Sequence, residues 1–172
     1  MTDEVALEVA QPHDAPLLAN LIELYVHDLS DVFPVELGPD GRFGYDRLPR
    51  YWMEPELRFP FLIRAGDRIA GFVLATRGSP ATNGGDDLDV AEFFVLRSHR
   101  RSQVGRRAAF LLWDRLPGHW IVRVSLGNRR ALSFWQPTIR AYTGGAMIET
   151  RRPGTPHPWT VFEFNAPGGA GR

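Results

Sequence analysis

The chain has 172 residues, enough for one compact domain with a buried core and too few for two. Hydrophobic residues make up 44% and charged residues 23%, as in ordinary globular proteins, and no apolar run reaches the roughly 18–20 residues that a membrane span needs. The lack of such a run also means that we expect no membrane partner. Cysteine is absent and the five histidines are scattered, so we expect no disulfide, no cysteine nucleophile and no bound metal.

Acidic and basic residues are balanced in number but not in position. Residues 1–60 hold twelve acidic residues and four arginines, whereas residues 61–172 hold eight acidic residues and sixteen arginines. The acidic first third favours a cationic acceptor molecule over an anionic one, although a solvated acidic surface would give the same pattern. The acidic start "MTDEVALEV" argues against a secretory or transit peptide, so we expect a cytoplasmic protein.

The first half of the chain predicts two helices and then a hairpin. Asp14 is a plausible N-cap, and apolar residues at helical spacing behind it predict a helix over 14–30. A Pro/Gly-rich aromatic stretch follows and predicts a short helix around 46–53. Two β runs, 60–65 and 69–77, are joined by the turn sequence "AGDR".

The second half alternates strands and helices. The run 88–97 is almost continuously apolar, which predicts a strand buried on both faces. The later elements are expected as a helix from Val104 to Leu116, a strand over 119–127, a helix beginning at Asn128 that Pro137 should kink or split, and a closing antiparallel pair at 146–152 and 159–165. The order predicts a mixed α/β sheet in a single domain, 1–165, with a disordered tail, 166–172.

Residues 97–107, "RSHRRSQVGRR", form a basic stretch between the apolar strand and the next helix; we call it the arginine segment. Unpaired N–H groups and the positive end of the helix dipole make such a junction a potential anion site, and Gly105 would let the backbone approach the anion closely. Four arginines could add charge-assisted hydrogen bonds to phosphate: Arg100, Arg101, Arg106 and Arg107. A solvated, arginine-rich helix start is the alternative. Neither the Walker GxxxxGK[ST] motif nor the dinucleotide GxGxxG motif is present, which argues against nucleoside triphosphates and nicotinamide cofactors.

Two motifs resemble those of the GNAT superfamily of N-acetyltransferases. Residues 100–105, "RRSQVG", resemble its acetyl-CoA signature Arg/Gln-x-x-Gly-x-Gly/Ala, with Gln103 in place of the first glycine. The stretch "NRRALSFW", 128–135, resembles its Asn-x-x-Ala-x-x-Phe-Tyr motif, with Trp135 in place of the tyrosine. The resemblance covers about residues 4–165. It implies an acyl-CoA N-acyltransferase fold, with a mostly antiparallel sheet that splays between its fourth and fifth strands and is flanked by helices.

The resemblance also implies which residues bind acetyl-CoA. Backbone amides from Gln103 to Arg107 would hold the pyrophosphate, and a bulged strand end would offer main-chain groups to the pantetheine arm, one N–H polarising the thioester carbonyl. Asn128 would contact the cofactor, and its helix would line the thiol end. The implied cofactor-binding residues are Phe94, Val95, Leu96, Arg100, Arg101, Gln103, Val104, Gly105, Arg106, Arg107, Asn128 and Trp135.

Acetyl transfer needs a neutral amine, and therefore a general base. Glu92 is the leading candidate because it lies in an otherwise apolar strand, where an unpaired carboxylate is costly. Alternation places Glu92 on the same face as Phe94, unless a bulge shifts the register. The alternative is a structural ion pair with Arg97 or Arg123. Tyr142 is a candidate proton donor to the leaving thiolate, or else a packing residue, because the indole of Trp135 cannot supply a proton.

The resemblance implies that the first helix and the loop that follows it form one wall of the acceptor site. The candidate acceptor-binding residues are Tyr25, His27, Asp28 and Tyr51, with Tyr45 and Trp52 in the same aromatic cluster; for His27 a plain surface position is the alternative. The expected function is transfer of an acetyl group to a primary amine of a small, cationic acceptor by direct attack. Homodimers are frequent among such proteins, so a homodimer is possible.

Two other functions compete with this expectation. Loss of the motif glycine and tyrosine, at Gln103 and Trp135, suits a non-catalytic acyl-CoA sensor or structural protein. A nucleic-acid binder would use the arginine segment, but the basic residues cluster in one short loop and the pI is about 7.0, so no nucleic-acid partner is expected.

Overall fold

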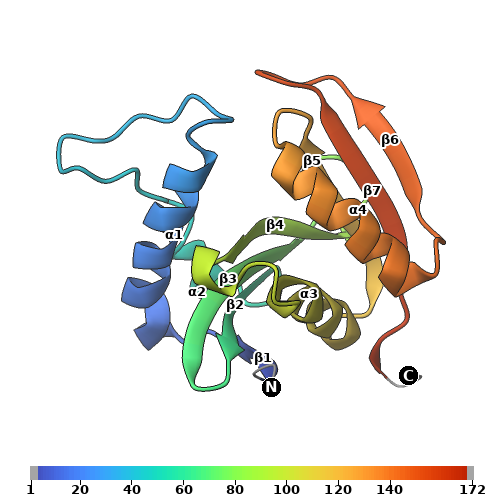
Figure 1. The fold of residues 1–172 in the computed structure, drawn as a ribbon, viewed down its shortest axis with the longest axis horizontal. Coiled ribbons are helices and arrows are strands. Elements are labelled where there is room, and N and C mark those ends of the chain that lie inside the picture. Colours follow the sequence, from blue (N-terminus) through green and yellow to red (C-terminus); the bar gives the residue numbers. More distant parts are fainter. Residues whose placement is uncertain (1–3, 170–172) are drawn as a thin grey trace.

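The computed structural model describes residues 4–169 and contains one seven-stranded sheet with the strand order β1-β2-β3-β4-β5-β7-β6 (Figure 1). The elements follow the order expected from the sequence. The strands are β1 (Val5–Val9), β2 (Arg58–Ala65), β3 (Arg68–Arg77), β4 (Leu88–Val95), β5 (Gly118–Ser125), β6 (Ile148–Arg152) and β7 (Trp159–Ala166). The α-helices are α1 (Ala15–Leu29), α2 (Arg50–Met53), α3 (Val104–Arg115) and α4 (Arg129–Thr143), with short 3-10 turns η1 (Pro12–Asp14) and η2 (Arg97–His99).

The sheet opens between β4 and β5, which form its one parallel pair. Only Leu88 with Trp120 and Asp89 with Ile121 are in register there, and beyond Asp89 the two strands diverge. The other neighbouring strands pair antiparallel along most of their length. The expected mostly antiparallel sheet, splayed between its fourth and fifth strands, is therefore confirmed. The splay leaves one edge of β4 free of strand partners from Val90 onward.

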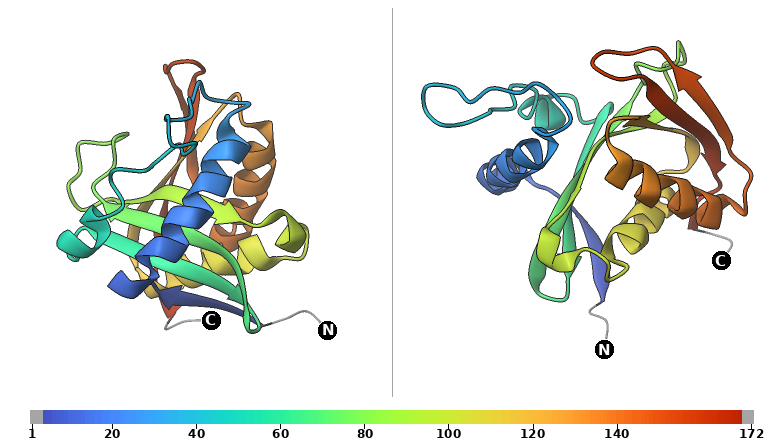
Figure 2. Two further views of the ribbon diagram at one scale, coloured as in Figure 1. Left: turned by 90° about the vertical axis from the view of Figure 1, so that its left-hand side faces the viewer. Right: turned by 45° about the horizontal axis from the view of Figure 1, so that its top comes forward.

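Alternation along β2, β3 and β4 builds a separate core on each face of the sheet. Leu62, Phe72 and Phe94 point toward α1 and α2, whereas Ile63, Val73 and Val90 point toward α3 and α4. Figure 2 shows α1 on one side of the first strands and α3 with α4 on the other. The side chain of each β4 residue therefore lies either on the α1 face or on the α3/α4 face of the sheet, and this decides which helices it can contact.

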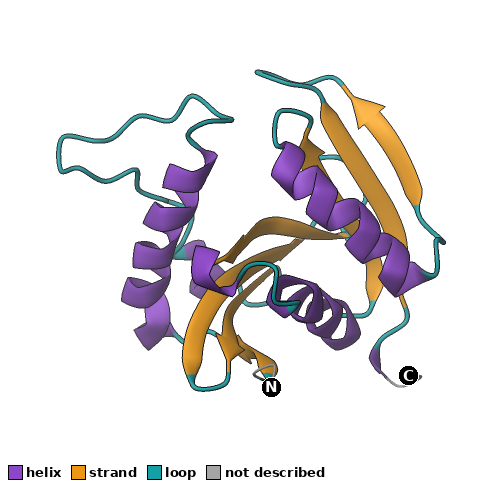
Figure 3. Ribbon diagram, viewed as in Figure 1, coloured by secondary structure: helices purple, strands orange, loops and turns teal. Residues whose placement is uncertain are grey.

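Several expected boundaries change in the structure. The second helix is only Arg50–Met53, and the long segment before it is mostly irregular and reaches away from the body (Figure 3). The expected split of the helix at Pro137 is wrong. Helix α4 runs through this proline because buried residues on both sides of it, Trp135 and Ile139, pack into the core, which offsets the roughly 3 kcal/mol that an internal proline costs. Ala166, expected in the tail, ends β7 and is buried; residues 170–172 of that tail lie outside the described part.

A β-bulge lies in β4, but earlier than the resemblance implied. Leu74 is opposite Glu92 and Ala75 is opposite Val90, so Ala91 is the extra residue. The bulge was expected at Phe94, Val95 and Leu96, and the register is regular through Phe94 and Val95. Glu92 and Phe94 consequently share a face, as alternation predicted.

Candidate active site

The arginine segment turns from β4 into α3 through an unusual backbone. Arg101 and Gln103 have φ angles of 62° and 66°, in the left-handed region that glycine adopts most easily. Gln103 is the N-cap of α3 and is the residue that replaces the motif glycine. The chain thus keeps a glycine-like backbone at this position without the glycine.

The first turn of α3 presents unpaired amide groups. The N–H of Arg107 donates to the carbonyl of Gln103 at 3.0 Å and is the first to find an acceptor within the helix. The N–H groups of Val104, Gly105 and Arg106 precede it and have no such acceptor. The amide of Arg107, expected among the anion-binding groups, is therefore already used by the helix.

The arginines of this segment divide into two groups. Arg97 and Arg100 both pair with Asp28 at the end of α1, with Arg97 Nη2 2.6 Å from Asp28 Oδ1. Arg100 also donates through Nε to the carbonyl of Val95 at 2.8 Å. Burial alone would raise the pKa of Asp28, but the hydrogen bonds from Arg100 and Arg97 outweigh it and lower that pKa. The remaining arginines are exposed around the turn: Arg101, Arg106 and Arg107.

Gly105 is required for packing rather than for an unusual backbone angle. A Cβ at this position would lie 3.1 Å from Cε2 of Phe134 and 3.5 Å from Cγ2 of Val95. The missing side chain therefore lets the start of α3 approach α4 and β4 closely.

Glu92 lies on the α1 face and has two tyrosine partners. The hydroxyl of Tyr25, on α1, donates to Oε2 at 2.7 Å, and the hydroxyl of Tyr45, in the segment before α2, donates to Oε1 at 3.0 Å. Burial raises the pKa of Glu92, and these two hydrogen bonds only partly oppose the rise. A carboxylate with a raised pKa holds an accepted proton more firmly, which suits a general base.

The expected alternative partners of Glu92 are engaged elsewhere. Arg97 pairs with Asp28, and Arg123 on β5 makes a bidentate pair with the fully buried Asp89, at 2.8 and 2.9 Å. Ser79 donates a further hydrogen bond to Asp89. Arg123 still acts on Glu92 through its charge, which lowers the pKa of that carboxyl.

The remaining acceptor candidates do not gather at one point. Tyr51 is buried, and burial together with the charge of Glu92 raises its pKa to about 12. His27 is exposed on α1, with its ring centroid 6.5 Å from that of Phe43. Asp28 is occupied by its two arginines. The structure therefore brings Tyr25 and Tyr45 to Glu92 and leaves His27 outside this group.

The α4 candidates have structural partners on the opposite face of the sheet. Tyr142 is 4% exposed, and its hydroxyl donates to Oδ1 of Asp114 at 2.8 Å. Trp135 is buried, 4.8 Å between ring centroids from Phe93 of β4. The side chain of Asn128 caps α4 by accepting from the N–H of Ala131 at 3.1 Å.

Sequence reasoning missed Glu23 as an organiser of the site. Its carboxylate accepts from the N–H groups of Phe43 and Gly44, at 2.7 and 2.9 Å, and so holds the turn that precedes Tyr45. The partners are 20 and 21 residues away, and no local pattern connects them. The Asp89–Arg123 pair was missed for the same reason.

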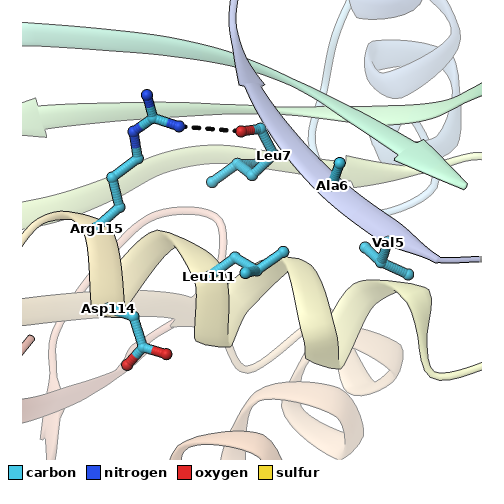
Figure 4. Close-up of a pocket in the computed structure, with 6 residues that line it drawn as sticks. All are labelled: Val5, Ala6, Leu7, Leu111, Asp114 and Arg115. Carbon is cyan, nitrogen blue, oxygen red and sulfur yellow. Dashed lines mark hydrogen bonds between the residues drawn. The ribbon is translucent and has the colours of Figure 1, made fainter. Parts of the chain in front are cut away.

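A hollow of about 470 Å³ lies away from these groups, between β1 and the C-terminal end of α3 (Figure 4). Val5, Ala6, Leu7 and Leu111 line it, and Arg115 crosses it to donate to the carbonyl of Leu7 at 3.1 Å. It contains none of the predicted site residues. Among residues 4–169, no three His, Asp or Glu side chains are grouped so that they could hold a metal ion. No helix in the same range is long and apolar enough to cross a bilayer.

Comparison with known proteins connects this geometry to a family. Residues 18–137 match the family model described as "Acetyltransferase (GNAT) family". A search of curated protein sequences finds no match.

Solved structures are similar over nearly the whole chain. An acetyltransferase from Thermus thermophilus has a TM-score of 0.64 at 18% identity, covering 96% of this chain and 99% of its own. Spermidine N-acetyltransferase from Vibrio cholerae, crystallised with CoA and spermine, has a TM-score of 0.63 at 11% identity, covering 94% and 95%. An aminoglycoside acetyltransferase crystallised with coenzyme A and kanamycin has a TM-score of 0.65 at 13% identity, covering 94% and 95%. At these identities the likeness shows the fold alone.

Proposed function

The chain belongs to the acetyltransferase (GNAT) family, and we propose that it transfers an acetyl group from acetyl-CoA to a primary amine of a small acceptor, with Glu92 as the general base. The observation that carries this proposal is the placement of Glu92: a half-buried carboxylate on the α1 face of β4, held by two hydroxyls, on the strand that leads into the turn we assign to anion binding.

The turn around Gln103 fits the diphosphate of coenzyme A. Left-handed residues such as Arg101 and Gln103 occur in turns whose backbone amides bind anions, and the first turn of α3 adds unpaired N–H groups. The exposed Arg101, Arg106 and Arg107 surround the turn and supply positive charge. Arg100 instead anchors the strand end, through Val95 and Asp28.

The free edge of β4 fits the pantetheine arm. The N–H of Leu96 donates to the carbonyl of Ala70 on β3 at 2.8 Å, so this group faces the sheet. Main-chain groups alternate along a strand, and those of Val95 therefore face the open edge. We assign the N–H of Val95 to the thioester carbonyl. Phe93 and Trp135 would pack beside the thiol end.

Bound acetyl-CoA supplies an acetyl group activated as a thioester, and the thiolate of coenzyme A is a good leaving group. Glu92 takes a proton from the acceptor ammonium, which frees the nitrogen lone pair to attack the carbonyl carbon. The C–N bond forms and the C–S bond breaks, with its electron pair on sulfur. After the C–N bond has formed, the nitrogen releases its second proton to solvent. The N–H of Val95 stabilises the oxyanion. The hydroxyl of Tyr142 is hydrogen-bonded to Asp114 on the α3/α4 face of the sheet, so we propose that the leaving thiolate takes its proton from solvent.

The acceptor is proposed to bind against Tyr25, Tyr45 and Glu92. The acidic first third suggested a strongly cationic acceptor, but Asp28 pairs with arginines, Asp31 pairs with Arg130 at 2.9 Å, and Glu23 is held by backbone amides. Asp28 and Asp31 are thus paired with arginines of this chain, and Glu23 is engaged by backbone amides and lies 3.8 Å from Arg42. A small acceptor with one amine at Glu92 fits this arrangement better than a polycation.

The test combines acetyl-CoA binding with thiol release over a panel of amines. Gln103→Glu is the most informative cofactor variant, because it changes one exposed side chain at the turn and adds a negative charge. A substitution at Gly105 would instead clash with Phe134. Binding with thiol release that Glu92→Gln abolishes supports the enzyme. Binding without release for any amine class would support the non-catalytic acyl-CoA protein.

A further inference from the structure

The two oxygens of Glu92 each receive one tyrosine hydroxyl from a different segment. Tyr25 comes from α1, and Tyr45 comes from the segment that precedes α2. Burial and the negative charge of Glu92 raise the pKa of both tyrosines, so both are neutral donors at neutral pH. Two donors on opposite oxygens fix the plane of a carboxylate, whereas a single donor would leave it free to turn.

Both donors are positioned by α1. Tyr25 lies on the helix itself, and Glu23, two residues earlier, binds the N–H groups of Phe43 and Gly44. Gly44 has a φ of 73°, and the turn that it makes places Tyr45 next in the chain. The helix therefore delivers one hydroxyl directly and the other through the carboxylate of Glu23.

The two hydroxyls suit orientation of the Glu92 carboxylate rather than proton relay. Both hydrogen bonds run from a tyrosine hydroxyl to the carboxylate. Burial and the charge of Glu92 raise the pKa of both tyrosines, so neither hydroxyl readily gives up its proton.

We propose that Tyr25 and Tyr45 are positioning residues that hold the Glu92 carboxylate in the orientation in which it accepts the amine proton, and that Glu23 acts through Tyr45. This inference rests on the proposed function. A carboxylate has about four acceptor sites, so the two tyrosines leave room for an incoming N–H. Other groups also act on Glu92: the charges of Arg123 on β5 and Arg47 before α2, with Tyr51 of α2 behind Tyr45.

The test removes one hydroxyl at a time with Tyr25→Phe and Tyr45→Phe. Each change deletes a hydrogen bond to a charged acceptor, so the acidic limb of the kcat/KM pH profile should move up by about one pH unit. The pKa of Glu92 should rise equally in the free protein, measured by carbon-13 NMR of the glutamate carboxyls and assigned with Glu92→Gln. A tyrosine that only supports the fold would leave both readouts unchanged, and that result overturns the proposal.

Two further variants separate the parts of this inference. Glu23→Gln should raise the pKa of Glu92 in the wild-type background but not in the Tyr45→Phe background, because its effect passes through Tyr45. Tyr142→Phe removes a buried hydroxyl on the other face and should leave the pKa of Glu92 unchanged. The NMR readout needs no turnover. If the tyrosine variants raise the pKa of Glu92 but the wild-type protein transfers no acetyl group, the tyrosines still orient the carboxylate and the proposed function is refuted. If wild type transfers acetyl groups but the tyrosine variants leave the acidic limb of the pH profile unchanged, the proposed function stands and the positioning role is refuted.

Discussion

Gln103→Gly should stabilise the protein, although glycine increases the conformational entropy of the unfolded chain. Gln103 is held at φ 66°, where a non-glycine residue is strained by about 1–2 kcal/mol. Glycine relieves this strain but adds about 0.4–1 kcal/mol of entropy to the unfolded chain. The mid-points of these two ranges differ by about 0.8 kcal/mol, so we expect a net stabilisation of about 0.5–1 kcal/mol, which in a domain of this size raises Tm by about 1–4 °C.

Thermal unfolding of three proteins measures this effect: wild type, Gln103→Gly and Ser102→Gly. Ser102 is the preceding residue and is not among the residues with positive φ, so its change to glycine relieves no strain. The change adds the entropic cost, removes the hydrogen bond from the Ser102 hydroxyl to the carbonyl of His99 at 2.6 Å, and should lower Tm. Acetyl-CoA should bind Gln103→Gly at least as tightly as wild type, because the amide at the turn becomes less covered. Equal decreases of Tm in the two glycine variants would refute a strained turn at Gln103.

Three further substitutions test the packing and the charges of the site. Gly105→Ala should destabilise the protein by about 1 kcal/mol in urea unfolding, because the new Cβ meets Phe134 at 3.1 Å; a stabilised variant would contradict this. Asp89→Asn should lower the free energy of unfolding by about 3 kcal/mol in the same measurement. This is the low end for a broken buried ion pair, because the Arg123 side chain is 24% exposed. A decrease of less than about 1 kcal/mol would contradict this. Glu92→Gln should lower kcat at least about 100-fold and leave acetyl-CoA affinity unchanged, in single-turnover and calorimetric assays. Because burial raises the pKa of Glu92, wild type should lose stability as pH rises above the usual glutamic acid range and the variant should not; the same pH dependence of Tm in both proteins would contradict this.

The sequence predicted those parts of the fold that depend on local patterns. Apolar periodicity located α1 and α3 to within about one residue, and the hairpin of β2 and β3 was marked by its turn sequence. The two motifs at residues 100–105 and 128–135 indicated the family, which the comparison confirms. These features are encoded by neighbours in the chain, and so they can be read without the tertiary structure.

Long-range contacts decided the rest. Glu92 was singled out from its apolar strand, but its partners lie 67 and 47 residues away in the chain, and no spacing rule connects them. Asp28 was expected to bind the acceptor because nothing local showed that Arg97 and Arg100 would reach it. Burial on both sides of Pro137 overrode the local preference of proline to end a helix.

Calorimetric titration of acetyl-CoA into wild type and Gln103→Glu tests most directly whether the turn before α3 binds the diphosphate. Wild type should bind in the micromolar range, about −8 kcal/mol. The added carboxylate lies at a helix N-terminus, which favours negative charge, so Tm should stay equal or rise while acetyl-CoA binds at least about tenfold more weakly. Equal affinity in the two proteins, or no binding to wild type, would contradict the assignment of this turn.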